Sequence, residues 1–214
     1  MFLRALSIVA VLMLGSGCGQ GSGSGTGQAG SGASPTPSAS APPAVGVCKN
    51  PNGKPVNQLN SPPATCIEPG KSYSATVRLA SGSFTIALDQ KAAPVTVNNF
   101  VYLAQQGFYN NLTFHRVEPG FVIQGGDPSG NGTGGPPYKL PNETNPAPWN
   151  AGSAGMASSA AGVNGSQFFI LLGDAPHLAR SGVYNHFGVV TTGMDVIQKV
   201  KPGDKITGID ITAQ

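Results

Sequence analysis

The chain has 214 residues, of which only 10% are charged, and its formal net charge is +3 at pH 7. This length allows one domain, or one domain with appended segments. Because the positive balance is weak and the basic residues form no clusters, nucleic acid is not expected as a partner. No charged residue lies between Arg4 and Lys49, where much of the glycine is found. The chain is therefore expected to divide into segments of different composition.

Residues 1–18 are typical of an export signal. Arg4 supplies one positive charge, an apolar run extends from Leu6 to Leu14, and small residues precede Cys18. The run is too short to span a bilayer but suits the apolar region of a signal peptide; a buried first helix is the alternative. The cysteine after small residues resembles a bacterial lipoprotein processing site, although Gly15 stands where that pattern has leucine. This resemblance implies that Cys18 carries lipid.

Residues 19–46 form a Gly-, Ser- and Pro-rich stretch without charges or aromatic residues. Such a composition cannot build a hydrophobic core and predicts a flexible linker. The linker would tether a folded domain to the outer face of the cell membrane; a secreted protein is the alternative.

Residues 47–72 contain Cys48 and Cys66, the only cysteines besides Cys18. In an exported protein two such thiols most simply form a disulfide, which would stabilise the fold by about 3 kcal/mol. Without export, both would be incidental free thiols. A zinc site is not expected, because no histidine lies near them.

From Tyr73 onward the sequence predicts one compact domain, over residues 73–214, with alternating β-rich runs and two helical patterns. The turn signal Ser-Gly-Ser at 81–83 predicts a hairpin. Many short strands with only two helices favour a mainly β fold, a closed β-barrel, over a parallel α/β sheet. The expected strands cover 75–80, 84–89, 112–117, 121–125, 166–172, 186–190 and 205–212, and the expected helices 93–107 and 193–200.

The usual hydrolytic motifs are absent from the sequence, and the three histidines, His115, His177 and His186, are too scattered to indicate a metal site. Residues 130–135 formally match G-x-G-x-x-G, but Pro-Pro-Tyr follows instead of a helix, which disfavours dinucleotide binding. No cofactor is expected.

Arg116 is unusual, because it stands among aromatic and aliphatic residues in "FHRVEPGFVIQGGD". Strand alternation would put Phe114 and Arg116 on one face. A buried guanidinium is costly unless it is paired. Arg116 is therefore either part of a structural ion pair, a surface side chain, or a functional group.

Three stretches carry a resemblance to a known family: "FHRVEPGFVIQGGDPSGNGTGG" from Phe114, "AGMASSAAGVNGSQFFI" from Ala154, and "HFGVV" from His186. Together they resemble the cyclophilin family of peptidyl-prolyl cis–trans isomerases, over nearly all of residues 73–211. The resemblance implies a closed eight-stranded antiparallel β-barrel with two capping α-helices. It also implies proline-containing polypeptides as substrates.

The chemistry of such an enzyme follows from the amide bond. Rotation about a peptide C–N bond costs about 18–20 kcal/mol because resonance is broken, and Xaa-Pro bonds exchange in tens of seconds or longer. A hydrogen-bond donor aimed at the prolyl nitrogen stabilises the twisted transition state, in which the nitrogen lone pair is freed. By resemblance Arg116 is this donor.

The remaining site residues are also implied by the resemblance. Phe121 and Gln124 would act with Arg116 in catalysis, Gln124 by holding Arg116 and the substrate backbone. The substrate would be bound by Val122, Ala157, Ser158, Phe169, His177, Leu178 and Tyr184.

Four of these positions depart from residues frequent in the family: Val122 replaces methionine, Ser158 asparagine, His177 tryptophan and Tyr184 histidine. Because imidazole offers less contact area than indole, cyclosporin-type inhibitors are expected to bind weakly. The only tryptophan, Trp149, lies outside the matching stretches.

Two functions remain from the sequence. The first is a monomeric isomerase that assists the folding of exported proteins near the membrane. The second is a proline-peptide binding module or chaperone with little turnover, and a purely structural lipoprotein is more distant. The presence of Arg116, Phe121 and Gln124 favours the first.

Overall fold

The structure is a computed structural model that describes residue 63 and residues 65–214. The expected signal peptide and linker, with Cys18 and Cys48, lie outside the described residues, so the predictions of export, lipidation and a disulfide remain predictions. Within the described part of the chain, no helix has the length and apolar character needed to span a membrane.

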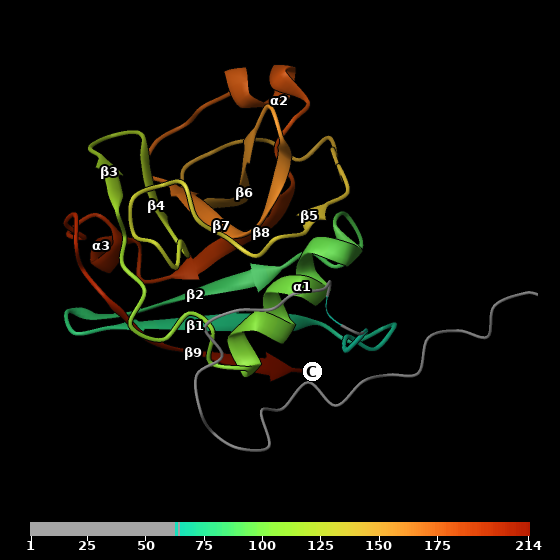
Figure 1. The fold of residues 1–214 in the computed structure, drawn as a ribbon, viewed down its shortest axis with the longest axis horizontal. Helices are drawn as coiled ribbons and strands as arrows, with labels where there is room; N and C mark the ends of the chain where they lie inside the picture. The colour runs from blue at the N-terminus through green and yellow to red at the C-terminus, as the bar shows by residue number, and fades with distance from the viewer. Residues whose placement is uncertain (1–62, 64) are drawn as a thin grey trace, which may run out of the picture. The chain divides into compact units, whose positions relative to one another are not determined.

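The domain is built on one curled antiparallel sheet (Figure 1). The strands follow one another in the sheet in the order β3-β4-β7-β6-β8-β2-β1-β9, and β5 pairs with β7. The strands are β1 (Tyr73–Leu79), β2 (Gly82–Leu88), β3 (Arg116–Glu118), β4 (Val122–Gly125), β5 (Lys139–Leu140), β6 (Ser153–Ser159), β7 (Gly162–Leu171), β8 (His186–Thr192) and β9 (Ile206–Ala213). The predicted mainly β fold is confirmed.

The expected closed barrel is not confirmed. The strand pairing ends at β3 on one side and at β9 on the other, and the described residues contain no ladder between these two strands. One isolated bridge, between Thr113 and Lys205, joins the segments that precede β3 and β9. The sheet is thus a half-barrel whose edges approach each other through that bridge.

β1 and β2 form the predicted hairpin because their side chains alternate between core and solvent. Ala75 and Val77 are fully buried, whereas Arg78 is exposed. Leu79 pairs with Gly82, so the turn is made by residues 80 and 81 rather than being centred on Gly82. Gly82 has a φ of +140°, a conformation that favours glycine.

α1 (Pro94–Gln105) is the main helix and packs against β9 and β7. Proline is well tolerated in the first turn of a helix, since its missing N–H would have no partner there. The Glu143 carboxylate caps this end by accepting hydrogen bonds from the N–H groups of Val95 and Thr96, both at 2.8 Å. Phe100 extends from α1 into the core, where its ring centroid lies 5.5 Å from that of Phe168 on β7.

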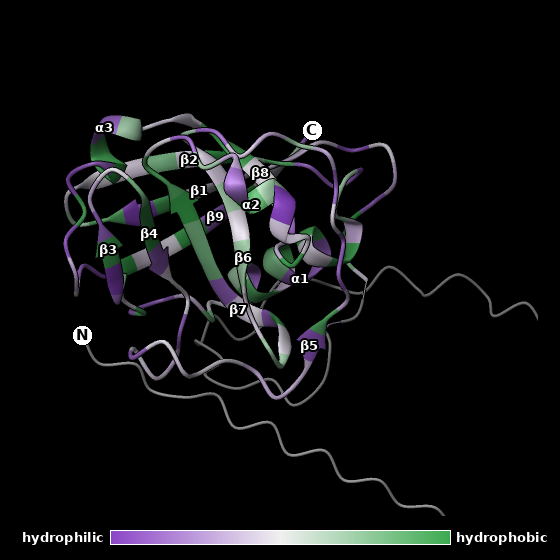
Figure 2. Cartoon of the chain, turned by 90° about the horizontal axis from the view of Figure 1, so that it is seen from above, coloured by the Kyte–Doolittle hydropathy of each residue, from purple (hydrophilic) through white to green (hydrophobic). Residues whose placement is uncertain are grey.

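The shorter helices differ from the prediction. The pattern at 193–200 forms only α3 (Met194–Ile197), and α2 (His177–Ser181) was not expected. Gly182 ends α2 in the left-handed conformation. β6 was also missed by the sequence reasoning, although it lies between β7 and β8. The last part of β7, which ends at Leu171, is coloured as hydrophobic (Figure 2), and most residues of this strand are buried.

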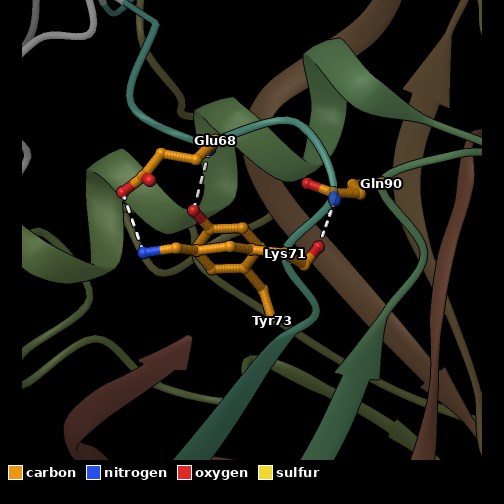
Figure 3. Close-up of polar contacts among 4 residues, drawn as sticks. All are labelled: Glu68, Lys71, Tyr73 and Gln90. Carbon is orange, nitrogen blue, oxygen red and sulfur yellow. Dashed lines mark hydrogen bonds and ion pairs between the residues drawn. The ribbon is translucent and has the colours of Figure 1, made fainter. Parts of the chain in front are cut away.

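The segment before β1 is fixed to the domain by side-chain contacts (Figure 3). The Glu68 N–H donates to the Tyr73 hydroxyl at 2.8 Å, the Lys71 ammonium pairs with Glu68 at 3.1 Å, and Gln90 donates to the carbonyl of Lys71. Ser72 exchanges two backbone hydrogen bonds of 2.9 Å with Gln214. The entry into β1 and the end of β9 therefore lie side by side.

Candidate active site

Arg116 lies at the start of β3 and is held by two neighbours. Its Nε and Nη2 donate to Oε1 of Glu118 at 2.9 and 2.7 Å, and its Nη1 donates to Oε1 of Gln124 at 3.0 Å. Glu118 is on the same strand face because it is two residues away, and Gln124 is the residue paired with Arg116 on β4. The guanidinium also lies over the Phe121 ring, 5.8 Å from its centroid.

The expectation that Phe114 and Arg116 lie on one face of a strand is wrong. Phe114 is fully buried, whereas the Arg116 side chain is 43% exposed. Strand alternation fails here because β3 begins only at Arg116, and Phe114 belongs to an irregular segment that donates a hydrogen bond to the carbonyl of Asp204 at 2.9 Å. The guanidinium is paired and lies at the rim of a pocket.

This pocket has a volume of about 100 Å³ and brings together every predicted site residue except His177. Its lining consists of Arg116, Phe121, Val122, Gln124, Ala157, Ser158, Phe169, Leu178 and Tyr184. Two larger grooves lie elsewhere, and neither has an arginine in its lining. The groove of about 380 Å³ is lined by residues 70–72 and other segments, and the groove of about 520 Å³ by Pro63 and residues within 65–70 together with other segments.

The pocket has an apolar interior and a polar rim. Val122 on β4 and Phe169 on β7 are 2% and 5% exposed and come from neighbouring strands. Tyr184 meets Phe169 edge to face, with ring centroids 5.6 Å apart. A bulge in β6 between Met156 and Ser158 locally re-aims the strand. A small apolar ring can enter here, beside the guanidinium.

A hydrogen-bond chain continues from Arg116 into the protein. The Gln124 amide accepts from Arg116 and donates to Oε1 of Gln167 at 2.9 Å. Gln167 in turn donates to the carbonyls of Gly132 and Gly134, at 3.1 and 2.7 Å. Because the Gln124 nitrogen is held by its hydrogen bond to Gln167, the Gln124 oxygen is kept facing Arg116.

Gln167 and Glu118 were missed by the sequence reasoning. In "SQFFILL" alternation places Gln167 on the same face as Phe169, a signal that could have been used. Glu118 could have been found as the residue two positions after Arg116. Both act on the guanidinium, Glu118 directly and Gln167 through Gln124.

Residues 74–211 match the family model described as "Cyclophilin type peptidyl-prolyl cis-trans isomerase/CLD". The chain belongs to this family. A peptidyl-prolyl cis-trans isomerase of Helicobacter pylori (strain J99) is 44% identical over 146 residues, which cover 66% of this chain and 89% of that protein. Peptidyl-prolyl cis-trans isomerase B of Bacillus subtilis is 51% identical over 116 residues, covering 53% of this chain and 80% of the relative.

A solved structure agrees. The crystal structure of a cyclophilin type peptidyl-prolyl cis-trans isomerase of Cryptosporidium parvum has 30% sequence identity and a TM-score of 0.57, over 67% of this chain and 98% of that one. The same protein was also solved in the presence of the dipeptide Ala-Pro, with a TM-score of 0.55. The predicted isomerase activity is therefore confirmed: the protein is a cyclophilin-type peptidyl-prolyl cis–trans isomerase.

His177 lies outside the pocket of this cyclophilin, at the exposed first position of α2. Its ring centroid is 6.0 Å from that of Phe121, and the two rings are tilted by 31°. His177 thus extends the Phe121 side of the rim and can contact a ligand only beyond the pocket itself.

The glycine-rich loop of the cyclophilin domain is organised around Asp127. Its carboxylate accepts hydrogen bonds from the N–H groups of Ser129, Asn131 and Gly132, at 2.7, 3.1 and 2.6 Å. Burial raises the pKa of Asp127, but the N–H donors together outweigh burial and hold the pKa below its usual value. The backbone donors of the loop are directed at this side chain, and the loop supports Gln167.

His115 has no place in the pocket lining. Burial lowers the pKa of His115 below its usual value, against the opposing influence of Asp127 and with a further lowering by Arg116. Within the described residues, no group of three His, Cys, Asp or Glu side chains is arranged to hold a metal ion.

Proposed function

We propose that the pocket between β4, β6 and β7 is where this isomerase acts, and that its substrates are proline-containing segments of exported polypeptides. The observation that carries the proposal is the position of Arg116 beside an apolar pocket. A guanidinium has five N–H groups, and three of these are donated to Glu118 and Gln124. One N–H on Nη1 and one on Nη2 remain for a substrate.

The free N–H groups suit the transition state better than the ground state. In the planar amide the lone pair of the prolyl nitrogen is delocalised, and it becomes an acceptor only when the bond twists. A donor held in place by Glu118 and Gln124 needs no reorganisation at that moment. Its hydrogen bond therefore lowers the barrier rather than only strengthening binding.

The other pocket residues divide between the proline ring and the peptide backbone. Phe169, Val122 and Leu178 offer apolar surface to the ring. Gln124 and the β6 residues at 157 and 158 offer polar groups to the main chain. The Cryptosporidium parvum cyclophilin studied with Ala-Pro supports a proline-containing peptide as the ligand.

Replacement of Arg116 tests this site. Arg116→Ala should lower kcat on an Xaa-Pro peptide, measured with a protease-coupled assay, by roughly 10²-fold or more, the scale of one preorganised donor. Thermal stability should change little, because exposed ion pairs contribute about 0–1 kcal/mol.

Arg78→Ala is the matched control. Arg78 also lies on a strand, is 46% exposed and pairs with the Asp210 carboxylate, but it has no place in the pocket. The control should keep wild-type turnover. Near-normal turnover of Arg116→Ala would remove the proposed role of Arg116.

The setting of this activity rests on the N-terminal sequence. We propose that the chain is exported, that Cys18 carries lipid, and that the linker holds the isomerase at the outer face of the membrane, near emerging clients. Detergent-phase partitioning of the wild type against Cys18→Ser tests the anchor. Equal recovery of both proteins in the aqueous phase would instead support a secreted enzyme.

A further inference from the structure

Trp149, which the sequence reasoning set aside, packs directly behind the proposed proline pocket. It lies in the loop between β5 and β6 and is 3% exposed. Its ring is stacked on that of Phe169, with centroids 5.6 Å apart and planes at 22°. It also meets Tyr184 edge to face at 6.3 Å. Phe169 and Tyr184 line the pocket, whereas Trp149 does not, so any effect of Trp149 must pass through these two rings.

Gly155 makes this stacking possible. On β6 it is the partner of Phe169 on β7. A Cβ atom at position 155 would overlap Phe169 Cζ and lie 2.7 Å from two ring atoms of Trp149. Real Cβ atoms essentially never come that close, so the two rings could not both keep their places beside any larger residue. Gly155 thus leaves β6 without a side chain at the place where the rings of Phe169 and Trp149 meet.

The backbone around Trp149 is fixed independently of the ring. The Trp149 carbonyl accepts a hydrogen bond from the N–H of Ala175 at 2.8 Å. The Ser153 hydroxyl accepts from the N–H of Asn150 at 3.1 Å and donates to the carbonyl of Pro148 at 3.2 Å. The indole is therefore attached to a loop whose backbone is held by hydrogen bonds. Because it is stacked on Phe169, it limits how far the Phe169 ring can rotate.

We propose that Trp149 is a positioning residue for substrate binding, which keeps Phe169 and Tyr184 in the orientation that grips the proline ring. The inference rests on the proposed role of the pocket. Since the apolar contact of Phe169 with the proline ring is the same in the planar and in the twisted amide, its loss weakens both states equally. Loss of such uniform binding raises KM and leaves kcat unchanged.

The test compares Trp149→Leu with Trp149→Phe in steady-state assays on an Ala-Pro peptide. Leucine removes the flat ring, and KM should rise roughly three- to tenfold, the scale of one aromatic pair, with kcat within about twofold of the wild type. Phenylalanine keeps a ring to stack on Phe169 and should restore most of the affinity. Equal KM values for wild type and Trp149→Leu would overturn the proposal.

A spectroscopic measurement does not depend on these variants. Trp149 is the only tryptophan of the chain, so intrinsic indole emission reports on this position alone. Titration of the wild type with the Ala-Pro peptide should change the emission saturably, with the same Kd as calorimetry. Unchanged emission at a peptide concentration that saturates the calorimetric signal would overturn the proposal.

Arg116→Ala separates this inference from the proposed function. That variant should lose kcat while it still shows the emission change, because the apolar contacts persist. If Arg116→Ala loses kcat and Trp149→Leu has a wild-type KM, the pocket stands and the positioning role falls. If Arg116→Ala keeps wild-type kcat, the pocket is not the site and both proposals fall.

Discussion

Gln167 is the residue whose replacement tests how the catalytic arginine is held. Its side chain is 3% exposed and makes three hydrogen bonds, one from Gln124 and two to the carbonyls of Gly132 and Gly134. Gln167→Ala removes all three hydrogen bonds at once. The Gln124 amide then has no fixed acceptor on its nitrogen side and can rotate, so that Arg116 is held by Glu118 alone.

The structure sets two separate magnitudes for this change. A buried polar group left unsatisfied costs about 1–3 kcal/mol. Because Gln124 and Gly134 are half-buried and Gly132 is exposed, water can meet much of the demand of the groups that lose Gln167, and we expect the free energy of unfolding to fall by about 1–3 kcal/mol in all. A donor that is present but less well oriented loses less than a deleted one, so kcat should fall by roughly tenfold, compared with roughly 10²-fold for Arg116→Ala.

Gln167→Glu is the matched variant, because a carboxyl group keeps an acceptor for Gln124 but has lost the amide donor to the glycine carbonyls. We expect Gln167→Glu to show most of the stability loss of Gln167→Ala but little of its loss of kcat. Urea unfolding gives the first quantity and the protease-coupled assay the second. A Gln167→Ala protein with wild-type kcat would refute the view that this hydrogen-bond chain orients Arg116.

Three further outcomes are expected. Burial lowers the pKa of His186 against the opposing influence of Asp89, so the unfolded chain binds the proton first as pH falls below about 6.5. The free energy of unfolding of the wild type should therefore fall by up to ~1.4 kcal/mol per pH unit, a loss that His186→Leu should not show. Denaturant unfolding from pH 7.5 to 5.5 measures this, and equal pH dependence of the two proteins would contradict it. His177→Trp should tighten cyclosporin-type inhibitors by about tenfold or more, since an aromatic anchor at an interface is commonly worth ~2 kcal/mol, with turnover little changed; equal inhibition constants would exclude the contact. Mass spectrometry of unreduced native protein should find Cys48 linked to Cys66, and two free thiols would disprove the disulfide.

Elements with strong local signals were predictable from the sequence. The β1–β2 hairpin shows clean alternation, and α1 has apolar residues at helical spacing. β6 was not predictable in this way, because "SAGMASS" lacks the β-branched and aromatic residues that favour strands. Its neighbours β7 and β8 make it a strand, and its small residues leave room for Phe169 and Trp149. The requirement comes from tertiary packing, which local patterns do not reveal.

The residues of the site also divide into those that could be predicted from the sequence and those that could not. The resemblance led to every residue that lines the pocket, but residue spacing could not place Arg116 at an exposed edge, because that depends on where β3 begins. Gln167 was visible through alternation with Phe169 and was overlooked. Trp149 could not have been found from spacing, since the contact with Phe169 depends on the path of the loop before β6 and on the missing side chain at Gly155.

The hydrogen-bonded pair of Ser72 and Gln214 means that the first and last strands of the sheet, β1 and β9, begin and end at one point. A short peptide joining these positions would make the polypeptide chain of the domain circular. The circular chain could then be opened elsewhere, for example at the exposed turn of residues 160 and 161 between β6 and β7. Such a circular permutant would keep the ladders of the sheet, but β7, β8 and β9 would be synthesised before β1 to β6. The same adjacency lets the domain be inserted into a surface loop of a host protein, with little separation imposed on the two ends of that loop.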